Sequence, residues 1–195
     1  TITVTNQNKN PVLIQSWIDN GSADEKTNKN VPFVLTPPNN RVDATKAQTL
    51  RISYLGSPAL PQDKESVFWL NVLEVPAKSK ANETSSQLNI AFRARIKMFY
   101  RPQNLPGTPI LAMENLHWEI KPNGINVTNP SKYYVSLLSI GYESGGKKKE
   151  IKDKMVAPGT SEFHEIKDGS VTNLRQVSYT AINDFGGYSK FKPKS

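Results

Sequence analysis

Apolar and polar side chains alternate along most of this chain, with a period of about two residues. Such alternation is typical of β-strands that bury one face, whereas the helical period of about 3.6 residues is hard to find. The alternation predicts strands at 1–5, 12–17, 50–55, 110–111, 125–128, 133–142, 171–182 and 188–191. Residues 67–73 are apolar on both faces, and 87–100 predict a strand much longer than the common ~5–6 residues.

Turn-forming residues separate these segments, as at Asn20-Gly21, Gly145-Gly146 and Gly186-Gly187. Short strands with regularly spaced turns are typical of a sandwich or a barrel. The segment 101–109 carries three prolines in nine residues and predicts a stiff connector. The sequence therefore predicts an all-β protein with two domains, at 1–103 and 104–195.

Composition narrows the chemistry. The 195 residues contain no cysteine, which excludes disulfides, thiolate metal sites and cysteine nucleophiles. No apolar run approaches the ~20 residues that a membrane-spanning helix needs. Thr1 already lies in an alternating segment and no leader precedes it, so we expect that an upstream part of the protein was removed or is missing.

Catalytic and metal-binding patterns are hard to find. The two histidines, His117 and His164, lie far apart, and no ligand spacing accompanies them. There is no nucleophile elbow, phosphate loop or dinucleotide fingerprint. We therefore expect neither a metal nor a cofactor, and a hydrolytic enzyme on a β scaffold is the least favoured of three hypotheses.

The net charge is +8, and part of it is concentrated in two clusters of lysines. The clusters are Lys147, Lys148, Lys149, Lys152 and Lys154, and Lys190, Lys192 and Lys194. A solvated hairpin tip and a frayed tail explain these clusters most simply. A binding module for acidic glycan or nucleic acid is the second hypothesis, and it predicts a steep dependence of binding on salt.

The long strand supports the leading hypothesis. From Leu88, alternate residues through Met98 are apolar, while Arg93, Arg95 and Lys97 lie on the other face. A half-buried strand would have the same pattern, but a stripe of this length can extend past its own core. Strand addition uses such a stripe, because main-chain hydrogen bonds supply affinity while alternate side chains fill pockets of the partner.

Several segments closely resemble the periplasmic pilus-assembly chaperones of the chaperone–usher pathway. They are 60–77 (LPQDKESVFWLNVLEVPA), 96–102 (IKMFYRP), 182–187 (INDFGG), 36–41 and 15–18, in the family's order over nearly the whole chain. The resemblance implies two immunoglobulin-like sandwiches in a boomerang arrangement. It implies a periplasmic protein that caps pilus subunits with its own strand and delivers them to an outer-membrane usher. Nucleic acid is then not an expected partner.

The resemblance also assigns roles to residues. Leu88, Ile90 and Phe92 match the side chains that enter the subunit groove, and Lys97 matches the lysine that binds the subunit's terminal carboxylate. An ammonium suits that role because charge-assisted hydrogen bonds are strong. A second set matches the family's interdomain ionic cluster, which fixes the angle between domains. This set is Glu65, Arg101 and Asp184.

The chain departs from the family at its beginning. The family has a first strand with an arginine that shares the carboxylate with the lysine, and no residue here matches it. We therefore expect residues 1–195 alone to bind subunits poorly, and the exposed edge favours self-association. The short segment between Val75 and Leu88 resembles the short-loop, PapD-like branch, which typically assembles rod-like pili.

Overall fold

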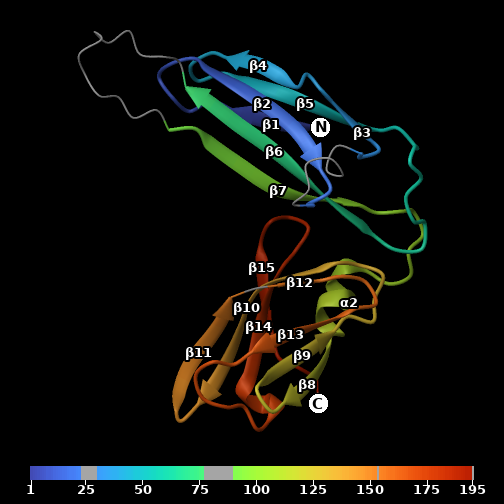
Figure 1. Ribbon diagram of the computed structural model, residues 1–195, viewed down its shortest axis with the longest axis vertical. Coiled ribbons are helices and arrows are strands. Elements are labelled where there is room, and N and C mark those ends of the chain that lie inside the picture. The colour runs from blue at the N-terminus through green and yellow to red at the C-terminus, as the bar shows by residue number, and fades with distance from the viewer. Residues whose placement is uncertain (23–29, 77–89, 153, 195) are drawn as a thin grey trace. The chain divides into compact units, whose positions relative to one another are not determined.

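The computed structural model describes residues 1–22, 30–76, 90–152 and 154–194 (Figure 1). The chain forms two compact units, and nearly all of their regular structure is β. Unit 1 comprises Thr1–Leu60 and Ser66–Tyr100, and unit 2 comprises Pro61–Glu65 and Arg101–Ser195. The predicted all-β class with two sandwich domains is confirmed.

Unit 1 is a sandwich of two antiparallel sheets. One sheet has the order β1-β5-β3, and the other has the order β4-β2-β6-β7. The strands are β1 (Ile2–Thr5), β2 (Val12–Asp19), β3 (Phe33–Thr36), β4 (Asn39–Val42), β5 (Ala47–Tyr54), β6 (Ser66–Pro76) and β7 (Phe92–Tyr100). Figure 1 shows β7 at the edge of its sheet, beside β6.

The core of unit 1 lies between these sheets because alternate residues of each strand point inward. Ile14 and Ile18 of β2 pack with Leu50 of β5 and Leu70 of β6, and all four are buried. No residue of 66–75 is exposed, which agrees with the apolar character of both faces of β6.

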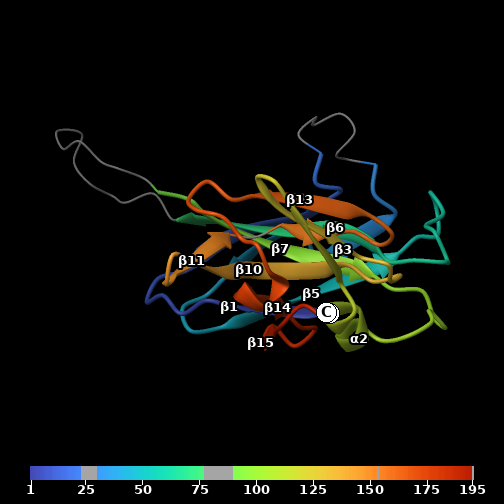
Figure 2. The ribbon, with the colours of Figure 1, turned by 90° about the horizontal axis from the view of Figure 1, so that it is seen from below.

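Unit 2 is a second sandwich. Its larger sheet has the order β11-β10-β14-β15 (Figure 2), with β12 beside β10. Its smaller sheet has the order β13-β9-β8. The elements are α2 (Pro109–Glu114), β8 (His117–Lys121), β9 (Gly124–Thr128), β10 (Val135–Ser144), β11 (Lys147–Lys152), β12 (Met155–Val156), β13 (Ser161–Glu165), a 3-10 turn (Leu174–Gln176), β14 (Val177–Ile182) and β15 (Tyr188–Phe191). Its core includes Ile125, Val127, Leu137, Ile140 and Tyr179.

The strand predicted at 110–111 is wrong, because these residues belong to the helix α2. Thr108 caps the helix, since its hydroxyl accepts a hydrogen bond from the N–H of Leu111 at 3.3 Å. Pro109 at the first helical position has the backbone angle that a helix needs. The cap and the proline explain the helix better than the two apolar residues explain a strand.

Two predicted strands begin too early because side chains bond to the backbone there. In the segment 171–182, Asn173 and Gln176 form a capping box around the 3-10 turn, and β14 begins only at Val177. In the segment 133–142, Asn129 donates to the carbonyl of Tyr133 at 2.7 Å, and β10 begins at Val135. These hydrogen bonds compete with the strand ladder.

The long strand predicted at 87–100 is shorter than expected. It begins at Phe92, so Ile90 and Ala91 lie outside it, and residues 87–89 lie outside the described residues. Phe92 is paired with Glu74 of β6, two residues before β6 ends at Pro76. Proline has no N–H for the ladder, which explains why the pairing stops nearby.

The lysine cluster begins directly beside a hairpin tip, as expected, but most of its lysines lie on the strand that follows the tip. Gly145 and Gly146 form the tip, both with positive φ, and the lysines begin β11. The cluster therefore lies on an edge strand, and lysine on an exposed edge opposes pairing with another chain.

Candidate functional site

The strand β7 is paired on one side only. Nine residue pairs join it to β6, from Ser66 with Tyr100 to Glu74 with Phe92. Among the described residues no strand pairs with its other side. That side therefore presents main-chain N–H and C=O groups as a template for an added strand.

The apolar side chains of β7 pack in the core of unit 1 near the end of the strand and become exposed toward its start. Met98 and Tyr100 pack against the core of unit 1, whereas Ile96 is half-exposed. Phe92 is 66% exposed and Ile90, two residues before it, is 54% exposed. The structure thus brings Ile90 and Phe92 to the surface beside an open strand edge, while Leu88 lies outside the described residues.

Lys97 lies on the opposite face of β7. It is directly across from Trp69 of β6, which is in turn across from Asp19 of β2. Residues directly opposite in a sheet share a face, so Lys97 shares its face with both of them. The predicted difference in face between Lys97 and the apolar stripe is confirmed within the strand. The predicted role of Lys97 in binding a carboxylate stays a prediction.

Sequence reasoning missed a polar network on the same face as Lys97. Asp19 ends β2 and is buried, and it forms an ion pair with Arg95 at 3.0 Å. Burial alone raises the pKa of Asp19, but hydrogen bonds from Arg95, the Gly21 N–H and Asn71 outweigh it and lower the pKa below its ordinary value of 3.8. The register of three strands is needed to see that Asp19, Asn71 and Arg95 lie together. In the sequence, the only indication of this network was the pair of arginines at 93 and 95.

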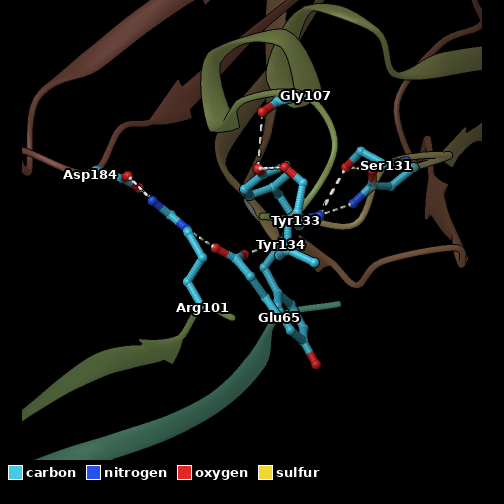
Figure 3. A network of polar contacts seen from close by, with 9 residues as sticks. Glu65, Arg101, Gly107, Ser131, Tyr133, Tyr134 and Asp184 are labelled. Carbon is cyan, nitrogen blue, oxygen red and sulfur yellow. Dashed lines mark hydrogen bonds and ion pairs between the residues drawn. The ribbon is translucent and has the colours of Figure 1, made fainter. Parts of the chain in front are cut away.

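The structure brings Glu65, Arg101 and Asp184 together, as predicted (Figure 3). Arg101 donates through Nε to Glu65 at 2.6 Å and through Nη1 and Nη2 to Asp184 at 2.7 and 3.1 Å. Glu65 is buried, and its other oxygen accepts from the N–H of Tyr134 at 2.7 Å. All of these residues belong to unit 2.

The surroundings of Arg101 stabilise its charge. The hydrogen bonds with Asp184 raise its pKa, burial opposes this effect, and Glu65 adds to the increase. The guanidinium also lies over the ring of Tyr133, 5.3 Å from its centroid. Figure 3 shows Arg101 pointing between the two carboxylates, which is typical of a structural ion pair.

Two family models match the chain. Residues 1–106 match the pili and flagellar-assembly chaperone, PapD N-terminal domain, and residues 111–192 match the pili assembly chaperone PapD, C-terminal domain. This chain belongs to the family of pili assembly chaperones. Its two-domain fold is therefore that of a pili assembly chaperone.

Similar proteins agree with this assignment. The chaperone protein FimB/FhaD of Bordetella pertussis is 43% identical over 98% of this chain and 80% of its own length. The probable fimbrial chaperone YadV of Escherichia coli is 44% identical over 95% of this chain and 79% of its own length.

Solved structures are similar as well. The crystal structure of the YadV chaperone covers 97% of this chain and 89% of its own, with a TM-score of 0.80 and 40% identity. The Salmonella enterica SafA pilin in complex with the SafB chaperone gives a match with a TM-score of 0.80 and 28% identity, covering 97% of this chain and 86% of its own. No helix in the described parts of the fimbrial chaperone is long and apolar enough to cross a membrane.

Proposed function

We propose that this chain is a periplasmic chaperone that caps pilus subunits by donor-strand complementation and passes them to an outer-membrane usher. It acts by binding and is not an enzyme. The observation that carries the proposal is the open edge of β7 with exposed apolar side chains next to it. The similar SafB chaperone is in complex with a pilin, which supports a pilin as the partner.

Ile90 and Phe92, with Leu88 before them, are the proposed donor side chains. Main-chain hydrogen bonds from the side of β7 that faces away from β6 align the subunit, and the apolar side chains fill its groove. Complete burial of a side chain such as Phe contributes about 1.5–3 kcal/mol, and Phe92 is two-thirds exposed before binding. Burial of Ile90 and Phe92 is therefore large enough to decide affinity.

Lys97 is the proposed partner of the subunit's terminal carboxylate. A carboxylate end is a chemical feature that every subunit shares, so its recognition sets the register of strand addition without depending on side chains. The proposed role of the Arg101 cluster is structural. Glu65 and Arg101 adjoin β6 and β7 at two of the places where the chain passes from one unit to the other.

Co-expression with candidate pilins followed by pull-down tests this proposal. We expect Ile90→Asp to reduce capture at least tenfold, because a carboxylate cannot enter an apolar groove without a large desolvation cost. Leu55→Asp is the matched control, since Leu55 is also an exposed apolar residue of unit 1 but lies far from β7 in sequence and outside its sheet.

Lys97→Ala tests the carboxylate partner in the same assay, with Lys46→Ala as the control at an exposed lysine of unit 1. We expect Lys97→Ala to reduce capture and Lys46→Ala to leave it unchanged. If Ile90→Asp and Lys97→Ala both capture pilin as well as the original chain, strand donation by β7 is wrong.

The binding of acidic glycan or nucleic acid is less well supported. Two lysines of the proposed cluster already contact the chain itself, since Lys149 donates to the carbonyl of Asp168 at 3.1 Å and Lys154 lies 3.9 Å from Glu162. A steep loss of polyanion binding with salt, in the absence of pilin, would support this alternative instead.

A further inference from the structure

The first half of β7 has little apolar packing to hold it in place. Phe92 and Ile96 lie on its inner face and are exposed by 66% and 48%, and Ala94 between them is exposed as well. An edge strand has one ladder of hydrogen bonds, so packing or side-chain contacts must supply the rest of its order. For residues 92–96 those contacts lie on the outer face.

The outer-face network is centred on Asp19, whose side chain is only 3% exposed. Its Oδ2 accepts from Nδ2 of Asn71 at 2.7 Å. Its Oδ1 accepts from the N–H of Gly21 at 2.9 Å and from Nη2 of Arg95 at 3.0 Å. Arg93 donates through Nε and Nη2 to Oδ1 of Asn71 at 2.9 and 2.6 Å.

Two tryptophans extend this network. The guanidinium of Arg93 lies 5.1 Å from the ring centroid of Trp17, and that of Arg95 lies 4.9 Å from the ring centroid of Trp69. The Trp69 ring also packs on the backbone of Gly21, where an added Cβ would clash with the ring. The network therefore joins β7 across β6 to β2, two strands away.

We propose that Asp19, Asn71, Arg93 and Arg95 are positioning residues that keep the donor half of β7 ordered and in register before a subunit arrives. This inference rests on the proposed function, because it assumes that β7 is the strand that captures the subunit. A strand that is already ordered loses less conformational entropy when a partner adds to it. The network performs this role from the face that the donor side chains do not use, so it does not compete with the subunit groove.

The charge of Asp19 explains why two arginines are needed. A buried carboxylate is costly without partners, and here it receives hydrogen bonds from one arginine, one amide and one backbone N–H. Both guanidiniums remain about half-exposed, so solvent weakens each ion pair and the effect of one substitution is moderate. The arginines bind through fixed forks and stacking, which a lysine does not reproduce.

Hydrogen exchange on the free protein tests the positioning of β7. We expect Arg95→Gln and Asp19→Asn to speed exchange of those amides of 92–98 that bond to β6 by roughly tenfold, while amides of β2 and β5 change little. Arg95→Lys is expected to fall between Arg95→Gln and the original chain. Arg41→Gln is the matched control, because the Arg41–Asp43 pair lies at the other edge of the sheet and is mostly exposed.

A uniform increase of exchange across unit 1 would mean that the network contributes only global stability, and it would overturn the proposal. So would unchanged exchange in β7 of both Arg95→Gln and Asp19→Asn.

Subunit capture by the same variants tests the link to function. We expect a slower association with pilin for Arg95→Gln and no change for Arg41→Gln. Faster exchange in β7 with unchanged capture would refute the positioning role while the proposed function stands. Because residues 1–195 alone are expected to bind subunits poorly, capture is measured with excess pilin. If the original chain then captures none, the proposed function fails, and the exchange data still decide whether the network orders β7.

Discussion

At the scale of single residues, the most informative group is a buried acid that no sequence motif predicted. The partners of Asp19 are set by strand register, because the pairing of β2, β6 and β7 brings it together with Asn71 and Arg95. The alternation of β7 did predict that Arg93, Arg95 and Lys97 share a face, but not which carboxylate they face.

The pH dependence of stability is the first prediction at this scale. Asp19 faces Arg93 and Arg95, and its pKa in the folded protein is below the ordinary value of 3.8. A lowered folded pKa contributes stability that is fully present above the unfolded pKa and is lost as pH falls through the folded pKa. We expect the stability difference between the original chain and Asp19→Asn to be constant from about pH 7 to about pH 5 and to shrink below about pH 4. Urea unfolding of both proteins measures it, and a difference that already shrinks near pH 6 contradicts the assignment.

The second prediction concerns Gly21, which has a φ of +81° and lies against the Trp69 ring. Gly21→Ala introduces strain of about 1–2 kcal/mol and displaces the ring. Gly56→Ala has a similar φ of +77° but no atom within 4 Å of the added carbon. We expect Gly21→Ala to cost at least about 1 kcal/mol more than Gly56→Ala, because only the former adds a steric clash. Equal unfolding midpoints in urea would show that Trp69 does not depend on Gly21.

The third prediction concerns Glu65. Glu65→Ala leaves the N–H of Tyr134 without its acceptor and removes one partner of Arg101. We expect a loss of about 1–3 kcal/mol in the stability of unit 2. Glu119→Ala is the control, because its pair with Lys121 is exposed, and we expect a change within about 0.5 kcal/mol. Thermal unfolding of the two variants tests this difference. Equal unfolding midpoints for Glu65→Ala and Glu119→Ala would contradict a structural role of Glu65.

At the scale of elements, alternation predicts the strands of an antiparallel sandwich well when one face is buried. It succeeds at β2, β5, β9 and β15. It does not predict β3, β4, β11, β12 or β13, which are short or carry polar residues. A short strand has too few alternating positions to be distinguished from the loops around it. In β11 the alternation is hidden by lysines, because this strand lies at a solvated edge.

Three errors at element ends share one physical cause. At Thr108, Asn129 and Asn173 a side chain bonds to the backbone and ends or prevents a strand. Such residues are common in turns, so their presence alone does not reveal which backbone group they will bind. The start of β7 was placed too early for a different reason, because alternation extends to Ile90 and beyond although pairing with β6 stops at Phe92.

At the scale of the whole molecule, the two sandwiches differ in how they treat their sheet edges. Unit 2 places lysines on β11 and on β15, which are the two edge strands of its larger sheet. Unit 1 leaves β7 open with Ile90 and Phe92 exposed beside it. β7 also carries Arg93, Arg95 and Lys97, but these lie on its outer face, and its inner face is an apolar stripe beside an open edge, which favours strand addition.

The central claim is that a subunit adds a strand to the free edge of β7. Hydrogen exchange of the chain with and without bound pilin measures this addition directly. We expect the alternate amides of residues 92–96 that point away from β6 to gain protection of roughly a hundredfold or more on binding, because these N–H groups become hydrogen-bonded to the added strand. We expect the amides of β11 to be unchanged. A complex that forms without added protection in β7 would contradict the account.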